Sequence, residues 1–265
     1  MGVSKQTRTY ASRYKTDVSV SQTTDTGFDS TTRILCSGDG ADSAMSASDD
    51  VFSVQPVNDD TTGAMLVKNQ GGSNILAVDT TNSKVLIGAS QVAANTQYVH
   101  FSVLNHTPAA GRHYPMGLGL ANFATAGLTE DVILGTGTDP ATTLDISETA
   151  SESVSWAQCY LYLPDAIVLD SAIVLSGGSS ASDSALNFHI MSYTLDTSTN
   201  HGDLSSGLVV ADSSATSGID EDVIKTTSLT IQSANIAANK VLLATYESDS
   251  ANVTSSRMIV KYHIQ

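Results

Sequence analysis

The sequence predicts an all-β protein with three zones: an extended arm over residues 1–50, a short-strand β-segment over 51–96, and an antiparallel, jelly-roll-like β-sandwich over 97–265. Short runs rich in Val, Ile, Leu and Tyr recur along the chain, and clusters of Gly, Asn, Asp and Ser separate them, which is typical of strands and turns. Helical spacing of apolar residues is nearly absent, apart from a weak pattern at 118–126. The hydrophobic fraction of 41% allows a sizeable core at this length of 265 residues.

Charge and hydropathy exclude two classes of protein. The chain has 12 Lys plus Arg against 27 Asp plus Glu, and no basic residue lies between Arg112 and Lys225. A nucleic-acid binder needs a basic stripe, so nucleic acid is not an expected partner. No stretch approaches the roughly 20 apolar residues that span a bilayer, and the N-terminus lacks the apolar run of a secretory signal. Neither a membrane segment nor a signal is therefore predicted. Cys36 and Cys159 are expected as buried thiols, with a disulfide weakly indicated.

The first zone is polar, of low complexity, and basic at its start, in contrast to the acidic remainder. A segment of this composition cannot build a core of its own, so we expect it to lie along the surface of a partner. The alternative is that it folds back on its own body. The residues expected to dock into an acidic or carbonyl-rich groove are Lys5, Arg8, Arg13 and Lys15.

The second zone contains four short apolar runs separated by polar turn clusters. The runs cover residues 51–57, 64–67, 75–78 and 85–87. Each is too short to bury both faces alone, and the apolar faces would be better covered if identical chains wrapped around a threefold axis. We therefore predict a homotrimer. Its expected contact residues are Ile75, Leu76, Val78, Val85 and Ile87.

One stretch of this zone carries a family resemblance. Residues Asn74–Gly88, NILAVDTTNSKVLIG, resemble the N-x-L-x-V-D-T-x-N-x-x-V-x-I-G segments of fibres and other appendage proteins of tailed bacteriophages. The pattern contains two strands joined by a polar turn, with alternating Ile, Leu and Val buried and Gly88 releasing the chain at its end. Such units commonly trimerise in phage fibres, so the resemblance implies a trimer in a virion. The C-terminal segments YLYLPDAIVLD and IVKYHIQ are similar to segments of virion proteins of marine phages.

The third zone has the length and rhythm of one sandwich. Residues 153–163 alternate, which places Trp156 and Tyr160 on one face of a strand and Cys159 and Leu161 on the other. In the closing strand, one face is expected to enter the core, because Met258, Val260, Tyr262 and Ile264 alternate with Arg257, Ile259, Lys261 and His263. The other predicted strands cover residues 98–104, 167–175, 185–193, 207–210, 228–231, 241–246 and 257–264.

No catalytic constellation stands out, so we predict a non-enzymatic protein without a cofactor. The Gly-x-Gly pairs at 117–119 and 135–137 lack the setting of a dinucleotide site and indicate turns. His106 and His113 flank a loop and could share a metal, but loop histidines are the expected role and no metal site is predicted. Ser, His and Asp are so common that any proposed triad would be arbitrary.

Acidic side chains can bind calcium or take part in glycan cleavage. The clusters at 49–50, 59–60 and 220–222 could gather oxygen ligands for calcium, but none matches an EF-hand loop, so solvated loops are expected. Glycan cleavage needs two carboxylates and aromatic platforms, whereas aromatic residues make up 6% of the chain and Trp156 is expected in the core.

Together these patterns indicate a structural protein of a phage virion. The expected role is a trimeric capsid decoration or head-fibre protein, attached to capsid proteins by its basic arm, with the acidic sandwich exposed. The alternative is a tail fibre or adhesin, attached to tail proteins, whose loops bind a host-surface receptor or glycan.

Overall fold

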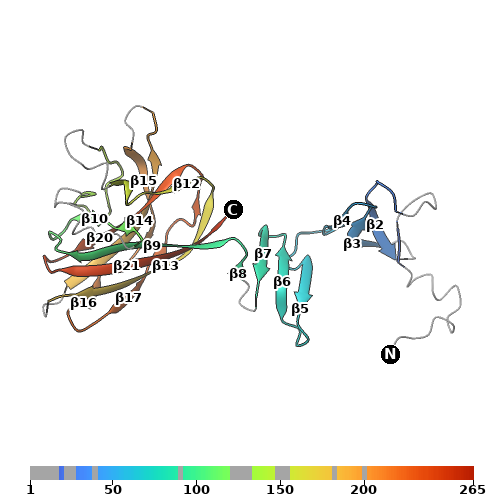
Figure 1. Ribbon diagram of the computed structural model, residues 1–265, viewed down its shortest axis with the longest axis horizontal. Helices are drawn as coiled ribbons and strands as arrows, with labels where there is room; N and C mark the ends of the chain where they lie inside the picture. Colours follow the sequence, from blue (N-terminus) through green and yellow to red (C-terminus); the bar gives the residue numbers. More distant parts are fainter. Residues whose placement is uncertain are drawn as a thin grey trace. The chain divides into compact units, whose positions relative to one another are not determined.

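The computed structural model describes residues 18–20, 28–37, 41–88, 92–119, 133–146, 156–180, 184–198 and 202–265. The chain divides into two compact units, residues 1–94 and residues 95–265. The named elements of the described residues are all β-strands, and they form antiparallel sheets in both units (Figure 1). The predicted all-β fold class is therefore confirmed.

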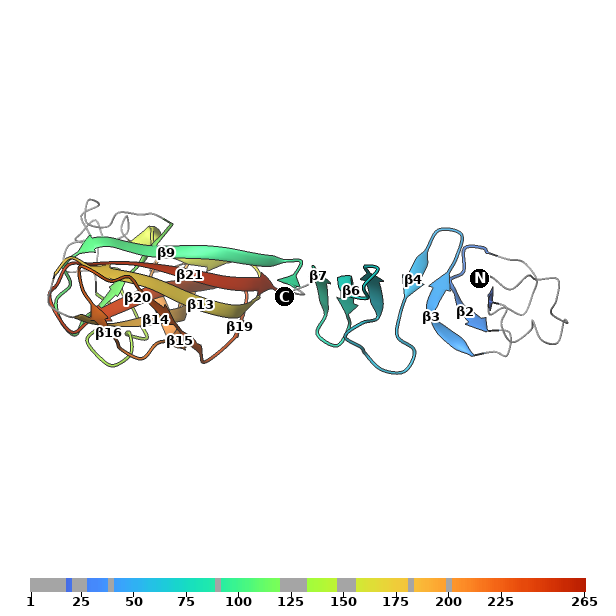
Figure 2. The same cartoon turned by 90° about the horizontal axis from the view of Figure 1, so that it is seen from below.

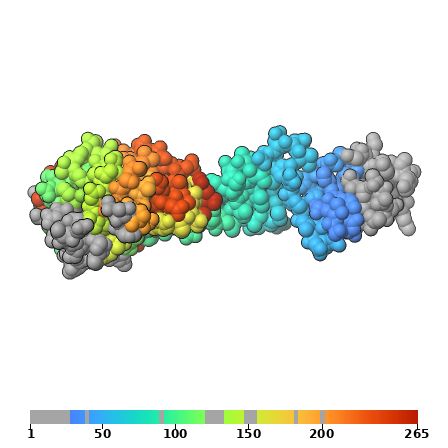
Figure 3. Space-filling view, turned by 90° about the horizontal axis from the view of Figure 1, so that it is seen from above, coloured from blue at the N-terminus to red at the C-terminus, as the bar shows by residue number. Residues whose placement is uncertain are grey.

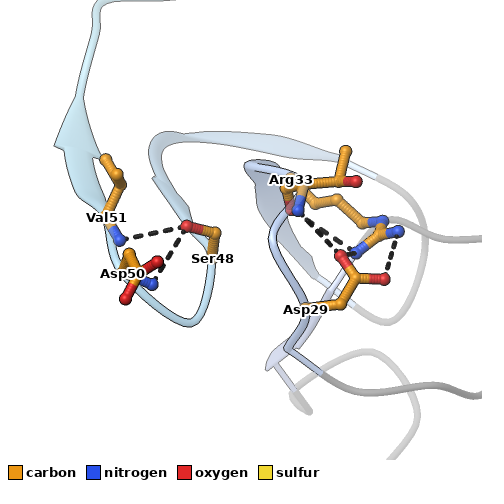
Figure 4. Close-up of polar contacts among 6 residues, drawn as sticks. Asp29, Arg33, Ser48, Asp50 and Val51 are labelled. Carbon is orange, nitrogen blue, oxygen red and sulfur yellow. Dashed lines mark hydrogen bonds and ion pairs between the residues drawn. The ribbon is translucent and has the colours of Figure 1, made fainter.

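The first sheet takes three strands from the zone that was expected to be an extended arm and the fourth from the predicted run 51–57 of the second zone. Its strands, in spatial order, are β1 (Val18–Val20), β2 (Arg33–Ser37), β3 (Asp42–Ala47) and β4 (Phe52–Val54). None of residues 28–37 and 41–54 is buried, so this sheet has no core of its own. Within the predicted arm, residues 33–37 and 42–47 are therefore not an extended arm but paired strands, because strand pairing satisfies backbone groups even where side chains stay exposed. Ser48 shapes the turn between β3 and β4, since its Oγ accepts hydrogen bonds from the N–H groups of Asp50 and Val51 (Figure 4).

An ion pair precedes β2. The two Nη atoms of Arg33 donate hydrogen bonds to the two carboxylate oxygens of Asp29, and the Nη2–Oδ2 distance is 2.8 Å (Figure 4). The N–H of Thr31 donates to Oδ1 of the same carboxylate at 2.9 Å. The hydrogen bonds from Arg33, followed by the one from Thr31, lower the pKa of Asp29 to about 2.

Replacing Arg33 by Gln should raise the pKa of Asp29 towards its ordinary value of 3.8, because the charged donor is lost. The folded-state pKa lies below the ordinary value, so the pair stabilises the sheet above that value, and the contribution is lost as the pH falls through about 2. Carboxyl ¹³C NMR titration of wild type and variant measures the change. Arg257→Gln, in the other unit, is the control and should leave Asp29 unchanged. An unaltered Asp29 titration in Arg33→Gln would contradict the assignment.

The second sheet of unit 1 is a four-stranded meander. Its strands, in order, are β5 (Met65–Lys68), β6 (Asn74–Asp79), β7 (Lys84–Ile87) and β8 (Val92–Ala93). Asp79 shapes the β6–β7 turn, where its carboxylate accepts hydrogen bonds from the backbone and side-chain N–H groups of Asn82 at 3.0 and 2.8 Å. Gly88 ends β7 with a φ of 76°. The predicted hairpin of residues 74–88 is therefore confirmed.

Unit 2 is an antiparallel β-sandwich, as predicted, and its long strands lie side by side in Figure 2. We call one layer the β14 sheet; its strands are β10 (His113–Pro115), β12 (Leu161–Leu163), β14 (Ser184–Leu195), β15 (Leu204–Asp212), β16 (Thr216–Ile219), β18 (Thr230–Ile231) and β20 (Lys240–Ser248). We call the other layer the β21 sheet; its strands are β9 (Thr96–His106), β11 (Gly117–Leu118), β13 (Ile167–Gly178), β17 (Lys225–Ser228), β19 (Asn235–Ile236) and β21 (Thr254–Ile264).

The main core lies between these two sheets. Phe188 and Tyr246 of the β14 sheet belong to it, and so do Phe101, Met258 and Val260 of the β21 sheet. Met258 and Val260 are fully buried, so the predicted inward face of the closing strand is confirmed. β21 is paired on both sides, with β9 and β13, and therefore occupies the interior of its sheet.

A second apolar cluster covers the other face of the β14 sheet. Met191, Tyr193 and Leu243 from this face pack with Leu134 and Trp156 from the preceding loops. Segment 133–146 is held there by backbone bonds between Leu144 and Leu204, and by a hydrogen bond of 2.6 Å from the Tyr193 hydroxyl to the carbonyl of Ala141. The β14 sheet is thus buried on both faces around Tyr193.

This cluster corrects the predicted strand over residues 153–163. Residues 156–157 are helical and 158–159 form a turn, with the N–H of Cys159 bonded to the carbonyl of Trp156, and the strand β12 begins at Leu161. Trp156 and Cys159 both enter the second cluster, which a strand could not achieve because residues three apart face opposite sides. Trp156 is 1% exposed, so its expected core role is confirmed. Residues 153–155 and 120–126 lie outside the described residues, and Leu118 of the weak helical pattern lies in β11.

Candidate functional site

The register of the meander gathers apolar side chains from all four of its strands on one face. Directly paired residues project from the same face of an antiparallel sheet. One row runs through Met65, Val78 and Val85. The second row runs through Val67, Leu76, Ile87 and Val92. We call these seven residues the apolar face.

The apolar face is open in the single chain. Ile87 is 51% exposed and Val67 is 44% exposed, whereas Leu76 and Val78 in the middle strand are half-buried. None of the seven residues carries a charge or a polar group other than the Met65 thioether. The residues of the meander are coloured light blue to teal in the space-filling view (Figure 3). An uncharged, solvent-exposed apolar row of this kind marks an interaction surface.

The structure brings together four of the five predicted trimer contacts: Leu76, Val78, Val85 and Ile87. Ile75 differs, because it alternates with Leu76 along β6 and therefore projects from the opposite face, where Ala77 is buried. The sequence reasoning missed three members of the apolar face: Met65, Val67 and Val92. The alternation of Met65 and Val67 was a usable signal, but Val92 belongs to a two-residue strand with no periodicity to detect.

The residues predicted to dock the arm, Lys5, Arg8, Arg13 and Lys15, lie outside the described residues. The Cys159 side chain is buried, and burial raises the pKa of its thiol to about 12. Cys36 is half-buried rather than buried, because its strand belongs to a sheet without a core.

His106 and His113 do not share a site. The His106 ring contacts Tyr114, with ring centroids 4.8 Å apart, and its Nδ1 bonds to the Tyr246 hydroxyl. His113 instead packs against His189, with ring centroids 5.1 Å apart. The predicted solvated loops at 49–50 and 59–60 are exposed. In the part of the chain that the structure describes, no three His, Cys, Asp or Glu side chains group as metal ligands.

A pocket lies at the β12 end of the sandwich. Tyr162 and Tyr262 line it together with Gln97 and Asp165. Tyr162 is 45% exposed, and its hydroxyl donates a hydrogen bond of 2.8 Å to Oδ1 of Asn239, which fixes the ring. An exposed, fixed aromatic ring beside polar groups can contact a polar ligand.

Within the described residues, no helix is long and apolar enough to cross a membrane.

Comparisons with known proteins give the chain no family. No protein-family model and no curated protein match it. Among solved structures, the CBM22-1 and GH10 modules of endo-1,4-β-D-xylanase 10B from Clostridium thermocellum, complexed with xylohexaose, are similar to part of it, with 16% identity and a TM-score of 0.24. The match covers 40% of this chain and 18% of that chain, and no functional argument rests on it.

Proposed function

We propose that the protein is a non-enzymatic structural protein of a phage virion that forms a homotrimer through its apolar face. The observation that carries the proposal is the exposed apolar face, whose seven residues lie on a meander that has almost no core. Fully burying a Val, Ile or Leu side chain contributes roughly 1.5–3 kcal/mol, so three copies of this face stabilise one another strongly. The resemblance of residues 74–88 to phage fibre segments favours the threefold arrangement.

The charge distribution supports a role as a capsid decoration or head-fibre protein. The start of the chain is basic, with Lys5, Arg8, Arg13 and Lys15, whereas no basic residue lies between Arg112 and Lys225 in the sandwich. An acidic or carbonyl-rich surface of the capsid therefore attracts the N-terminal arm, and an acidic shell repels the sandwich. We infer attachment through the arm, with the sandwich directed outward.

Ile87→Asp should convert the trimer to a monomer and abolish its incorporation into particles, because three carboxylates would meet in an apolar interface. Val78→Asp should do the same. Sedimentation of the full chain measures the oligomeric state, and labelling of purified virions measures incorporation and position.

Ile75→Asp is the matched control, since it lies on the same strand as Val78 but on the opposite face. It should leave the trimer intact. A monomeric wild-type chain would contradict the trimer. A normal copy number of Ile87→Asp in virions would show that attachment does not require trimer formation.

A tail adhesin is the second candidate, favoured by the pocket beside Tyr162. An exposed tyrosine with Gln97 and Asp165 nearby provides the stacking surface and hydrogen-bonding groups that a host glycan would use. The virion labelling decides between the two positions: label on the head supports the decoration role, and label on the tail supports the adhesin.

A further inference from the structure

A polar cluster lies beside the second apolar cluster, on the same face of the β14 sheet. Its residues come from neighbouring strands in adjacent rows. One row runs through His113, Glu247 and Asn187. The next row runs through Thr245, His189 and Asp212. The loop of residues 133–139 covers this face, because the N–H of His113 bonds to the carbonyl of Gly135 and the N–H of Leu134 bonds to the carbonyl of His113.

Four buried polar atoms of this cluster have no hydrogen-bond partner. They are Nδ1 of His113, Nδ1 of His189, Oδ1 of Asn187 and Oγ1 of Thr245. His113 and Thr245 are fully buried and His189 is 4% exposed. A buried polar atom without a hydrogen-bond partner destabilises the fold, so a cluster of four indicates a bound species that satisfies them.

The other nitrogen of each imidazole already faces an oxygen. Nε2 of His113 lies 2.8 Å from the carbonyl oxygen of Gly137, so it carries the proton and donates it there. Nε2 of His189 lies 3.6 Å from Oδ1 of Asp139, which favours a proton on that nitrogen as well. In each ring, the tautomer with the proton on Nε2 leaves Nδ1 as the acceptor atom. Metal-binding histidines show this arrangement, in which a carbonyl or carboxylate oxygen orients the ring through its second nitrogen.

The surroundings favour a cation. Asp139 from the loop, Asp212 from β15 and Glu247 from β20 all act on His189 electrostatically. The Asp139 side chain is 61% exposed, which opens the edge of the cluster to solvent.

We propose that His113 and His189 bind one divalent transition-metal ion through their Nδ1 atoms. The rings cross at 83° with centroids 5.1 Å apart, so both belong to one small site. Thr245 Oγ1, Asn187 Oδ1 and water supply oxygen ligands. Imidazole nitrogen prefers Zn²⁺ or Ni²⁺ to Mg²⁺ or Ca²⁺, so the site is selective for the former pair.

Titration of the full, metal-free chain with ZnCl₂ tests the proposal. Calorimetry should show one Zn²⁺ per chain, and the Tm should rise by roughly 5 °C when free Zn²⁺ reaches about a hundred times Kd. MgCl₂ should give no rise. His189→Asn and His113→Asn should each weaken Zn²⁺ binding at least about tenfold, and Asp139→Asn, which alters an exposed side chain, should weaken it about tenfold.

His100→Gln is the matched control, because His100 also has a buried Nδ1 without a partner but belongs to the β21 sheet. It should bind Zn²⁺ as wild type does. If the histidine variants fail to fold, ¹⁵N NMR of the wild-type imidazoles decides, because Zn²⁺ should shift two Nδ1 resonances. Absence of saturable binding, or equal binding by folded His189→Asn, would overturn the proposal, and neither result bears on the trimer.

Discussion

A fragment of residues 95–256 should show no cooperative unfolding, whereas a fragment of residues 95–265 should unfold cooperatively. The shorter fragment lacks most of β21, which pairs with both β9 and β13. It also lacks the fully buried Met258 and Val260. Loss of each large buried side chain costs about 2–5 kcal/mol, and the lost strand pairing adds to this, so the total is comparable to the usual domain stability of about 5–15 kcal/mol.

Calorimetry and near-ultraviolet circular dichroism of the two fragments measure this effect. The longer fragment matches the second compact unit and serves as the reference. Equal melting temperatures and equally sharp transitions for both fragments would show that β21 is dispensable, which would overturn the assignment of the closing strand to the core.

Gly207→Ala should destabilise the sandwich by about 2–3 kcal/mol and lower its Tm by roughly 5–10 °C. A Cβ at this position in β15 would lie 2.5 Å from Cε1 of Tyr193 and 2.8 Å from Cα of Thr142. The Thr142 backbone cannot retreat easily, because its carbonyl accepts a hydrogen bond of 2.8 Å from the N–H of Gly207. The substitution therefore forces segment 133–146 away from the sheet.

Gly177→Ala is the control for the loss of glycine itself. It also lies in a strand, and a Cβ there would meet the carbonyl oxygen of Val223 at 3.7 Å, an ordinary contact. Its Tm should stay within about 2 °C of wild type. Thermal unfolding of both variants makes the comparison, and a wild-type Tm for Gly207→Ala would mean that segment 133–146 does not pack against β15 as described.

The sequence predicted most long strands because a two-residue alternation is local and needs no knowledge of the fold. Met258 and Val260 illustrate this, since both were predicted to share one face of the closing strand and both are buried. The hairpin at 74–88 was predictable for the same reason, helped by the turn residues Asp79 and Asn82. Four of the five residues predicted as trimer contacts lie on one face, because Leu76 and Val78 alternate along β6 and Val85 and Ile87 alternate along β7.

The features that the sequence did not predict depend on packing between residues far apart in the chain. Trp156 and Cys159 looked like alternating strand residues, but a shared apolar cluster draws both to the same side and forces a turn. His113 and His189 meet through strand pairings with β20, and no local pattern connects two residues so far apart in the chain. The first sheet was missed because its strands bury no side chain, so hydrophobic periodicity gives no signal for it.

During protein synthesis, β9 is made long before β21, the strand with which it forms its longest pairing. About 150 residues separate the two strands, and among the described residues the other strand that pairs with β9 is the two-residue β11. At about 5–20 residues per second, a ribosome needs roughly 8–30 s to make that stretch. Throughout this time, Phe101 and Val103 of β9 lack the core that buries them in the folded sandwich. We therefore expect the yield of folded protein to depend on protection of this exposed apolar strand during synthesis.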